Sequence, residues 1–303
     1  MKQDFPSLAV SSWSWHAAYY TGRWSLLDLP EAAVTAGLAL IEANDFMLPP
    51  PRFSRLRQPL LRLLPGAPPE LWRYSRASLR QLKARAQAHE VTILAWTINS
   101  DFTVPRAHWP MQQLYLWRGL SAARQLGVTL LRINLGGSPE TAADRDELIA
   151  RRLAQFVGSS QQRLPGLTIT LENHWGVSTD IDRHLQIFDA ARALLDPALR
   201  PYLGCCFDPA NMPESDQRPR WWRELAARAN HFHLKTERFD DDGRELSLPH
   251  AEIGAILQAA GYRGWTTIEF SGEGDPLRGV QQSVALYAGL NIANQPQLTR
   301  GDN

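Results

Sequence analysis

Short apolar segments alternate with longer amphipathic segments along almost the whole chain, and this alternation restricts the fold more than any other feature. Eight apolar runs are predicted strands: residues 8–13, 38–42, 91–97, 129–134, 167–172, 203–208, 231–235 and 266–270. Each is followed by a segment with helical periodicity: 28–36, 71–88, 109–125, 140–156, 180–194, 220–229, 250–260 and 277–288. Glycine follows many of these helical segments, as at Gly37, Gly127 and Gly261, where a helix C-cap is expected.

Eight strands that each precede a helix predict an α/β protein with one (β/α)8 TIM barrel as its single domain. The barrel is expected over residues 1–293, because no change of composition marks a second domain in the 303 residues. Residues 294–303 are expected to form a polar C-terminal tail. The segment 49–69 is rich in proline and arginine, and it is predicted to be an extended loop or an irregular additional helix.

Charge and apolar content exclude several classes of protein. The 32 basic and 31 acidic residues nearly cancel, so no basic surplus indicates a nucleic-acid partner. No stretch reaches the roughly 20 apolar residues of a membrane helix, and the first residues lack the apolar run of a signal peptide. Cys205 and Cys206 are adjacent and would point to opposite faces of a strand, which disfavours a disulfide between them. We therefore expect a cytoplasmic protein without a membrane partner.

Polar residues recur on one face of the later strands. A barrel strand is buried on both faces, since one meets the helices and the other meets the barrel interior. Polar residues should point inward, and those near the C-terminal end of a strand reach the rim that carries barrel active sites. Alternation places the following groups on the inward face: Arg132 and Asn134; Thr168, Thr170 and Glu172; Cys206 and Asp208; His231, His233 and Lys235; Thr267 and Glu269.

Three carboxylates in that inward set would repel one another in a buried cavity. A divalent cation removes the conflict, and a histidine beside them would add one nitrogen ligand. We therefore predict one divalent metal ion held by Glu172, Asp208, His233 and Glu269. This oxygen-rich set suits Mn(II), with Mg(II), Co(II) and Zn(II) as alternatives, whereas Cu(I) prefers softer ligands. An ion network without metal is the alternative interpretation.

Five sequence pieces resemble one known family. They are IEAND at 41–45, LENHWG at 171–176, CFDPAN at 206–211, HFHLK at 231–235 and GWTTIEFSGEGDP at 264–276. In this order they resemble the xylose isomerase-like barrel superfamily, the sugar phosphate isomerase/epimerase group that also includes inosose dehydratases and endonuclease IV. The resemblance implies the same four metal ligands. The chain departs from the family pattern at Thr236, where aspartate is frequent, and at Asn211, where many epimerases carry histidine.

The resemblance implies a metal-dependent isomerase or epimerase that acts on a small sugar or polyol and is often paired as a homo-oligomer. In such enzymes Glu172 and Glu269 would transfer protons at the carbon beside a carbonyl, through an enediolate. Lys235, Arg132, His174, His16, Asn211 and Glu42 are predicted to bind substrate, and Trp13, Trp15, Trp96 and Trp175 to stack on a sugar ring. Lys235 could instead pair with a rim acid, and His174 could be a loop residue that orients Glu172. Glu42 and Arg132 could be structural, and His16 and the tryptophans could simply cover the pocket or fill the core.

Other residues are expected to be structural. His231 is interpreted as a hydrogen-bonded interior histidine rather than a fifth ligand, and Cys206 as a packing residue, because no base is evident beside it. His89, His108, His184 and His250 lie on or near predicted helices and are expected at the surface.

Three other functions remain open at this point. A dehydratase acting on an inosose-like polyol would use the same metal and acid–base pair. A DNA-repair enzyme like endonuclease IV would need further histidines, and the third strand ends at residues 97–99 without one. A barrel without catalytic activity would carry no stoichiometric metal.

Overall fold

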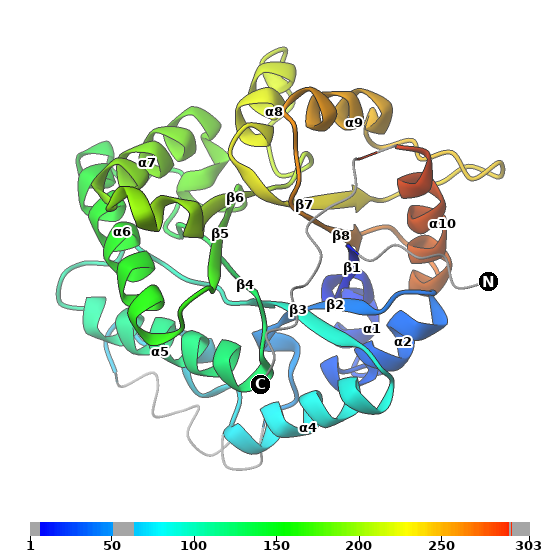
Figure 1. Ribbon diagram of the computed structural model, residues 1–303, viewed down its shortest axis with the longest axis horizontal. Helices are drawn as coiled ribbons and strands as arrows, with labels where there is room; N and C mark the ends of the chain where they lie inside the picture. Colours follow the sequence, from blue (N-terminus) through cyan, green and yellow to red (C-terminus); the bar gives the residue numbers. More distant parts are fainter. Residues whose placement is uncertain (1–6, 51–63, 291, 293–303) are drawn as a thin grey trace.

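Eight parallel strands close into one barrel in the order of the sequence, with helices around the outside (Figure 1). The computed structural model describes residues 7–50, 64–290 and 292. The strands are β1 Leu8–Ser11, β2 Leu40–Asn44, β3 Thr92–Thr97, β4 Leu130–Ile133, β5 Thr168–Glu172, β6 Leu203–Phe207, β7 Ala229–Thr236 and β8 Trp265–Phe270. The predicted (β/α)8 barrel is therefore confirmed, and all eight predicted strands are present with small shifts of their ends.

The helices form a ring around the strands. They are α1 His16–Tyr20, α2 Leu29–Thr35, α4 Arg76–Ala88, α5 Trp109–Leu126, α6 Asp146–Arg163, α7 Ile181–Leu194, α8 Arg218–Ala226, α9 His250–Ala259 and α10 Pro276–Gly289. The short α1, which continues a 3-10 turn over Ser12–Trp15, was not predicted. It lacks the length that makes helical periodicity visible.

Two predicted helices have different bounds in the structure. The segment predicted at 71–88 divides into a 3-10 turn over Pro69–Trp72 and α4, which starts at Arg76. Ser75 sets that start, because its hydroxyl accepts the main-chain N–H of Ser78 at 3.2 Å while the Ser78 hydroxyl accepts the N–H of Ser75 at 2.8 Å. The helix predicted at 140–156 lies at Asp146–Arg163, since the residues before it form the loop after β4.

The barrel interior changes character along its axis. Its N-terminal half is filled by a small apolar cluster: Ala9, Leu40, Leu94, Ala95, Leu130 and Trp265. Polar groups lie two residues later on the same faces of these strands. Glu42 follows Leu40 in this way, and Arg132 follows Leu130. The outward faces join the helices in one larger core, in which Phe207 and Phe232 lie 5.5 Å apart. Charged side chains therefore follow the apolar cluster toward the C-terminal ends of these strands.

Two helix histidines that were expected at the surface are buried. His184 of α7 is 0% exposed, and its Nδ1 lies 3.0 Å from the Ser178 hydroxyl. His250, the first residue of α9, is 4% exposed, with its Nε2 3.2 Å from a Glu245 carboxylate oxygen. Both are therefore buried against neighbouring residues of the loops, which helical position alone did not reveal.

Part of the predicted organisation lies outside the described residues. The C-terminal tail at 294–303 and most of the segment 49–69 belong to that part of the sequence. Within the described residues, no helix is both long and apolar enough to cross a membrane.

Candidate metal centre

Four side chains at the C-terminal ends of four consecutive strands converge on one point. Glu172 ends β5, Asp208 directly follows β6, His233 lies in β7 and Glu269 lies in β8. One potential ligand atom of each lies within 4.8 Å of the others. His233 Nδ1 is 3.2 Å from Glu172 Oε1, and 3.6 Å from both Asp208 Oδ2 and Glu269 Oε2. The structure therefore brings the four predicted ligands together.

The chemistry of this cluster fits a divalent cation. Glu172, Asp208 and His233 are fully buried, and Glu269 is 3% exposed. Asp208 Oδ2 and His233 Nδ1 have no hydrogen-bond partner although both atoms are buried. Buried polar atoms normally have a partner, and three buried carboxylates need positive charge nearby. A hard or borderline divalent ion would satisfy both requirements through three oxygens and one nitrogen.

Uncharged groups hold two residues of the cluster in place. Asn173 donates from Nδ2 to the main-chain oxygen of Asp208 at 2.7 Å, and its Oδ1 accepts the Asp208 N–H at 2.9 Å. The ends of β5 and β6 are thereby tied together beside the cluster. The Ser11 hydroxyl donates to Glu269 Oε1 at 3.1 Å. Neither Asn173 nor Ser11 was predicted as a site residue, because an amide after one strand and a serine at the end of another give no charge pattern.

Two cations lie against the carboxylates. Lys235 Nζ donates to Glu269 Oε2 at 2.7 Å and lies 3.8 Å from Asp208 Oδ2, while Arg132 forms an ion pair with Glu172. Burial alone would raise the pKa of Glu269, but Lys235, followed by His233 and Arg132, holds that pKa well below its usual range. Burial would likewise lower the pKa of Lys235, yet Glu269 raises it overall. Both partners are therefore charged at neutral pH.

Glu42 lies in the barrel interior beside the imidazole of His233. It accepts from Arg132 Nε at 2.7 Å and from the Thr97 hydroxyl at 2.9 Å. Its other oxygen is 3.2 Å from His233 Nε2 and 3.3 Å from His231 Nε2. Burial would raise the pKa of Glu42, but His233 and then Arg132 bring it well below its usual range. Glu42 is fully buried and is not among the residues that line the neighbouring cavity, so its predicted contact with substrate stays a prediction.

A cavity of about 280 Å³ opens onto the cluster. It is lined by Trp13, Tyr20, Asn44, Phe46, Glu70, Asn99, Arg132, Asn134, His174, Trp175 and Glu269. Glu269 and Arg132 connect it to the four-residue cluster. Aromatic rings and side-chain amides form most of the remaining wall, a mixture that suits a ligand with both C–H faces and hydroxyl groups.

Two of the four predicted stacking tryptophans line this cavity, Trp13 and Trp175. Trp15 and Trp96 instead belong to the core. Trp15 stacks on Trp24 with ring centroids 5.7 Å apart, and Trp96 is fully buried with its ring edge-on to Tyr74. Trp96 lies on the helix-facing side of β3, so its strand position points away from the cavity.

His174 lines the cavity from the loop after β5. Burial, followed by the charge of Arg132, lowers the pKa of His174 to about 4, so the ring is neutral at pH 7. Its Nδ1 is buried without a hydrogen-bond partner. His174 therefore contributes a neutral ring to the cavity wall.

The main chain fixes the wall that carries His174 and Trp175. The next residue, Gly176, has φ +73 and forms a bridge to Gly136 in the loop after β4. A Cβ atom at Gly176 would lie 2.2 Å from the main-chain oxygen of Gly136. Val177 N–H donates to that same oxygen at 3.0 Å. Only glycine fits here, and the loops after β4 and β5 are held as one unit.

The other two predicted substrate-binding residues lie near the site but outside the cavity wall. Asn211 donates from Nδ2 to Glu172 Oε1 at 3.4 Å. His16 stacks on Trp13 with ring centroids 4.8 Å apart, and its Nδ1 is 2.9 Å from the Trp13 main-chain oxygen. His16 is thus placed to orient Trp13, while Asn211 is placed to orient a carboxylate of the cluster.

Comparison with known proteins identifies the family of this chain. A model of the family described as xylose isomerase-like TIM barrel matches residues 31–289. The chain belongs to this family. No curated protein gave a significant match at the sequence level.

Solved structures of this family share the fold. The D-psicose 3-epimerase of Clostridium cellulolyticum H10, solved with D-tagatose, superposes with a TM-score of 0.65 at 14% identity, covering 95% of this chain and 100% of the other. An L-ribulose 3-epimerase gives a TM-score of 0.65 at 15% identity over 94% of each chain. IolI with a bound zinc atom gives 0.62 at 13% identity, over 94% of this chain and 97% of the other. At these identities the likeness shows the fold alone.

Proposed function

We propose that this protein is a divalent-metal-dependent sugar epimerase or isomerase. One observation carries the proposal: four buried side chains bring ligand atoms within 4.8 Å of one another, and two of them, Glu172 and Glu269, are carboxylates from different strands. β5 and β8, which carry them, are three strands apart around the barrel. A substrate bound between them would present opposite faces of one carbon to the two carboxylates.

The cavity supports a substrate the size of one monosaccharide. Trp13 and Trp175 provide apolar faces for C–H groups, and three asparagines of the wall provide donors and acceptors for hydroxyls. Among the described lining residues, Arg132 is the only lysine or arginine, and it is already paired with Glu42 and Glu172. We therefore propose an unphosphorylated sugar, because these residues leave no unpaired arginine or lysine for a phosphate group.

The side chains then take distinct roles. A divalent cation bound by the four residues would polarise the substrate carbonyl and acidify the neighbouring C–H bond. One of Glu172 and Glu269 removes that proton, and a proton returns to the opposite face of the enediolate through the other carboxylate, which must first take it up. Lys235 keeps Glu269 ionised, so Glu269 starts the reaction as a base. His174, which lines the cavity with a neutral ring, is proposed to contact the substrate.

Arg132, Asn211 and Glu42 are assigned positioning roles. Arg132 links Glu42 to Glu172, and Asn211 bonds a Glu172 oxygen that also lies near His233. Glu42 reaches the other nitrogen of His233 and so orients its ring toward the cation. A metal-ligating histidine commonly has such a partner on its second nitrogen.

A dehydratase is the second candidate function. The Lys235 ammonium, 2.7 Å from Glu269, is a proton source beside a base, which is the pair needed to expel a hydroxyl as water. A probable 3-DHS dehydratase, AsbF of Bacillus anthracis, shares the fold with a TM-score of 0.63 at 11% identity, over 93% of this chain and 98% of the other.

The test is proton exchange in deuterium oxide. Purified protein with Mn(II) is incubated with a panel of free ketopentoses, ketohexoses and inososes, alongside the phosphorylated ketoses. We expect deuterium to enter the carbon beside the carbonyl of one or more free ketoses, as detected by NMR, with conversion to an epimer or aldose. Glu269→Gln should abolish both signals, while Glu273→Gln, an exposed glutamate of the following loop, should retain them.

Each alternative gives a different result. Loss of one water from an inosose, without exchange into any ketose, would assign the dehydratase. Turnover of phosphorylated ketoses alone would overturn the unphosphorylated substrate. Stoichiometric metal binding without turnover across the whole panel would contradict an isomerase or epimerase of these sugars.

A further inference from the structure

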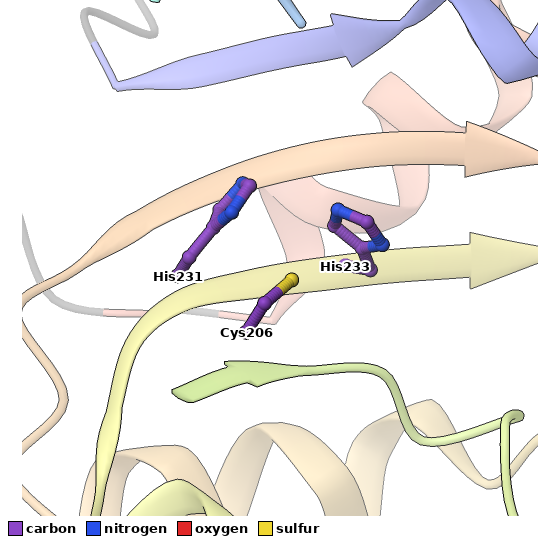
Figure 2. A group of neighbouring side chains, drawn as sticks. All are labelled: Cys206, His231 and His233. Atoms are coloured by element: carbon purple, nitrogen blue, oxygen red, sulfur yellow. The ribbon is translucent and has the colours of Figure 1, made fainter. Parts of the chain in front are cut away.

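A second group of metal-binding atoms lies in the barrel interior beside the four-residue cluster. Figure 2 shows Cys206, His231 and His233 on two adjacent strands, with their side chains directed to the same interior space. One ligand atom of each lies within 4.8 Å of the others, and all three residues are 0% exposed. His233 belongs both to this group and to the four-residue cluster of Glu172, Asp208, His233 and Glu269.

The β6–β7 pairing creates the group. Cys206 is the register partner of His231, and His233 follows two residues later on the same face. The pairing is irregular between Cys205 and Cys206, where the register shifts. The two imidazole rings meet edge to face with centroids 5.0 Å apart. A sulfur and two ring systems thus converge from adjacent strands, although no spacing within the sequence indicates a metal site.

The proton-transfer scheme uses neither Cys206 nor His231. His231 Nε2 is 2.8 Å from the Thr267 hydroxyl, as expected for a hydrogen-bonded interior histidine, but its Nδ1 is buried without a hydrogen-bond partner. Glu42 places a carboxylate oxygen 3.3 Å from His231 Nε2 and 3.2 Å from His233 Nε2. The group therefore offers one sulfur, imidazole nitrogens and an adjacent carboxylate.

The ligand chemistry differs between the two groups. The cluster at the rim supplies three carboxylates and one nitrogen, which suits hard ions such as Mn(II) and Mg(II). The interior group supplies a thiol with two imidazoles, the donors preferred by Zn(II) and related thiophilic ions. His233 is common to both, and its Nδ1 faces the carboxylates.

We propose that Cys206, His231 and His233 form a second metal site that takes a thiophilic divalent ion such as Zn(II) or Cd(II). Binding releases the Cys206 thiol proton to solvent and forms a sulfur–metal bond, with no electron transfer. Because His233 serves both groups, an ion in the interior site weakens the hold of the rim cluster on its own ion. Thiophilic metals would then inhibit the enzyme, because they would occupy His233, which the four-residue cluster also needs for its own ion.

Cadmium alone is the probe, and the neighbouring cysteine is the matched control. Cd(II) titrated into the wild-type protein should produce an ultraviolet thiolate-to-cadmium charge-transfer band and a ¹¹³Cd resonance shifted by sulfur coordination. Cys206→Ser should lose both signals. Cys205→Ser should keep them, since Cys205 is also buried and free but lies on the helix-facing side of β6.

Further variants separate binding from misfolding. His231→Gln should keep the fold and weaken the cadmium signal about tenfold or more in affinity. Cys206→Ala provides a second removal of the thiol, with circular dichroism confirming the fold of each variant. A charge-transfer band that survives in a folded Cys206 variant, or that is absent from the wild type at saturating cadmium, would overturn the proposal.

The shared histidine is tested through the other ion. Wild-type protein loaded with Mn(II) should release manganese when Cd(II) is added, as measured by the electron paramagnetic resonance of free Mn(II). Cys206→Ser should need about tenfold more cadmium for the same release. Equal release from both proteins would refute the coupling. None of these measurements needs a substrate, so they stand or fall independently of the proposed sugar chemistry.

Discussion

The two halves of the barrel interior are built from the same strands but carry opposite chemistry. At the N-terminal end, Leu40, Leu130 and Trp265 belong to a closed apolar cluster. Two residues further along β2 and β4 stand Glu42 and Arg132, which are charged and paired. Apolar packing is stabilising wherever it is buried, whereas buried charges are costly unless each one is compensated. One half of the interior therefore contributes to stability, while the other holds the charged groups of the candidate site.

The largest effect is expected from a carboxylate of the rim cluster. Glu269→Gln keeps the size of the side chain but removes its ability to accept a proton. Turnover should fall by about 10²- to 10⁴-fold, the usual contribution of a general acid or base. Steady-state kinetics on the substrate identified by the exchange experiment measure this. A fall of less than tenfold, with bound metal unchanged, would mean that Glu269 does not transfer the proton.

A comparable loss, but in stability, is expected at the opposite end of the barrel. Trp265→Ala removes the largest member of the apolar cluster and should lower the free energy of unfolding by about 3–5 kcal/mol. Urea denaturation measures it. Trp117→Ala, a 42% exposed tryptophan on α5, should change stability by about 1 kcal/mol or less. If the folded Trp265 variant also loses its metal affinity, the two halves are not independent.

Metal removal should produce a smaller stability change that depends on the rim cluster. At an ion concentration about 100 times the dissociation constant, bound metal stabilises the folded state by about 2.7 kcal/mol. Chelation should remove this increment, as measured by thermal unfolding with and without Mn(II). Asp208→Asn should show little or no increment, because it weakens one of the four ligands. An undiminished increment in that variant would place the ion elsewhere.

The smallest effect is expected at the cavity wall. Trp175→Ala removes an aromatic face worth about 0.5–1.5 kcal/mol, so KM should rise about 2- to 10-fold with little change in kcat. Trp117→Ala again serves as the control, since it lies outside the cavity wall. A large fall in kcat with unchanged KM would instead indicate that Trp175 positions the reacting groups.

Alternation along the strands was sufficient to predict the fold and the grouping of the four rim residues. It works because a buried strand must sort its side chains to two faces, and Glu172, Asp208, His233 and Glu269 all fall on the inward one. Strand position would also have excluded Trp96, whose side chain packs against Tyr74 outside the barrel. That residue was chosen for its type rather than its position.

Contacts between different strands could not be predicted from the sequence. Ser11 and Glu269 are 258 residues apart, yet the closure of β1 against β8 makes them hydrogen-bond partners. The group of Cys206, His231 and His233 depends on the register between β6 and β7, which includes an irregularity. Residue spacing within one segment does not reveal such a register, because the register is set only when the two strands pair.

The bridge between Gly136 and Gly176 has a consequence for how the substrate range of this protein can change through evolution. The wall bearing His174 and Trp175 is set by main-chain atoms that leave no space for a Cβ, so this side tolerates few backbone rearrangements. Tyr20 and Phe46 also line the cavity, but neither is adjacent in sequence to a glycine that fixes its main chain. Selection in the laboratory for bulkier substrates should therefore accumulate substitutions around Tyr20 and Phe46 before it alters residues 174–176.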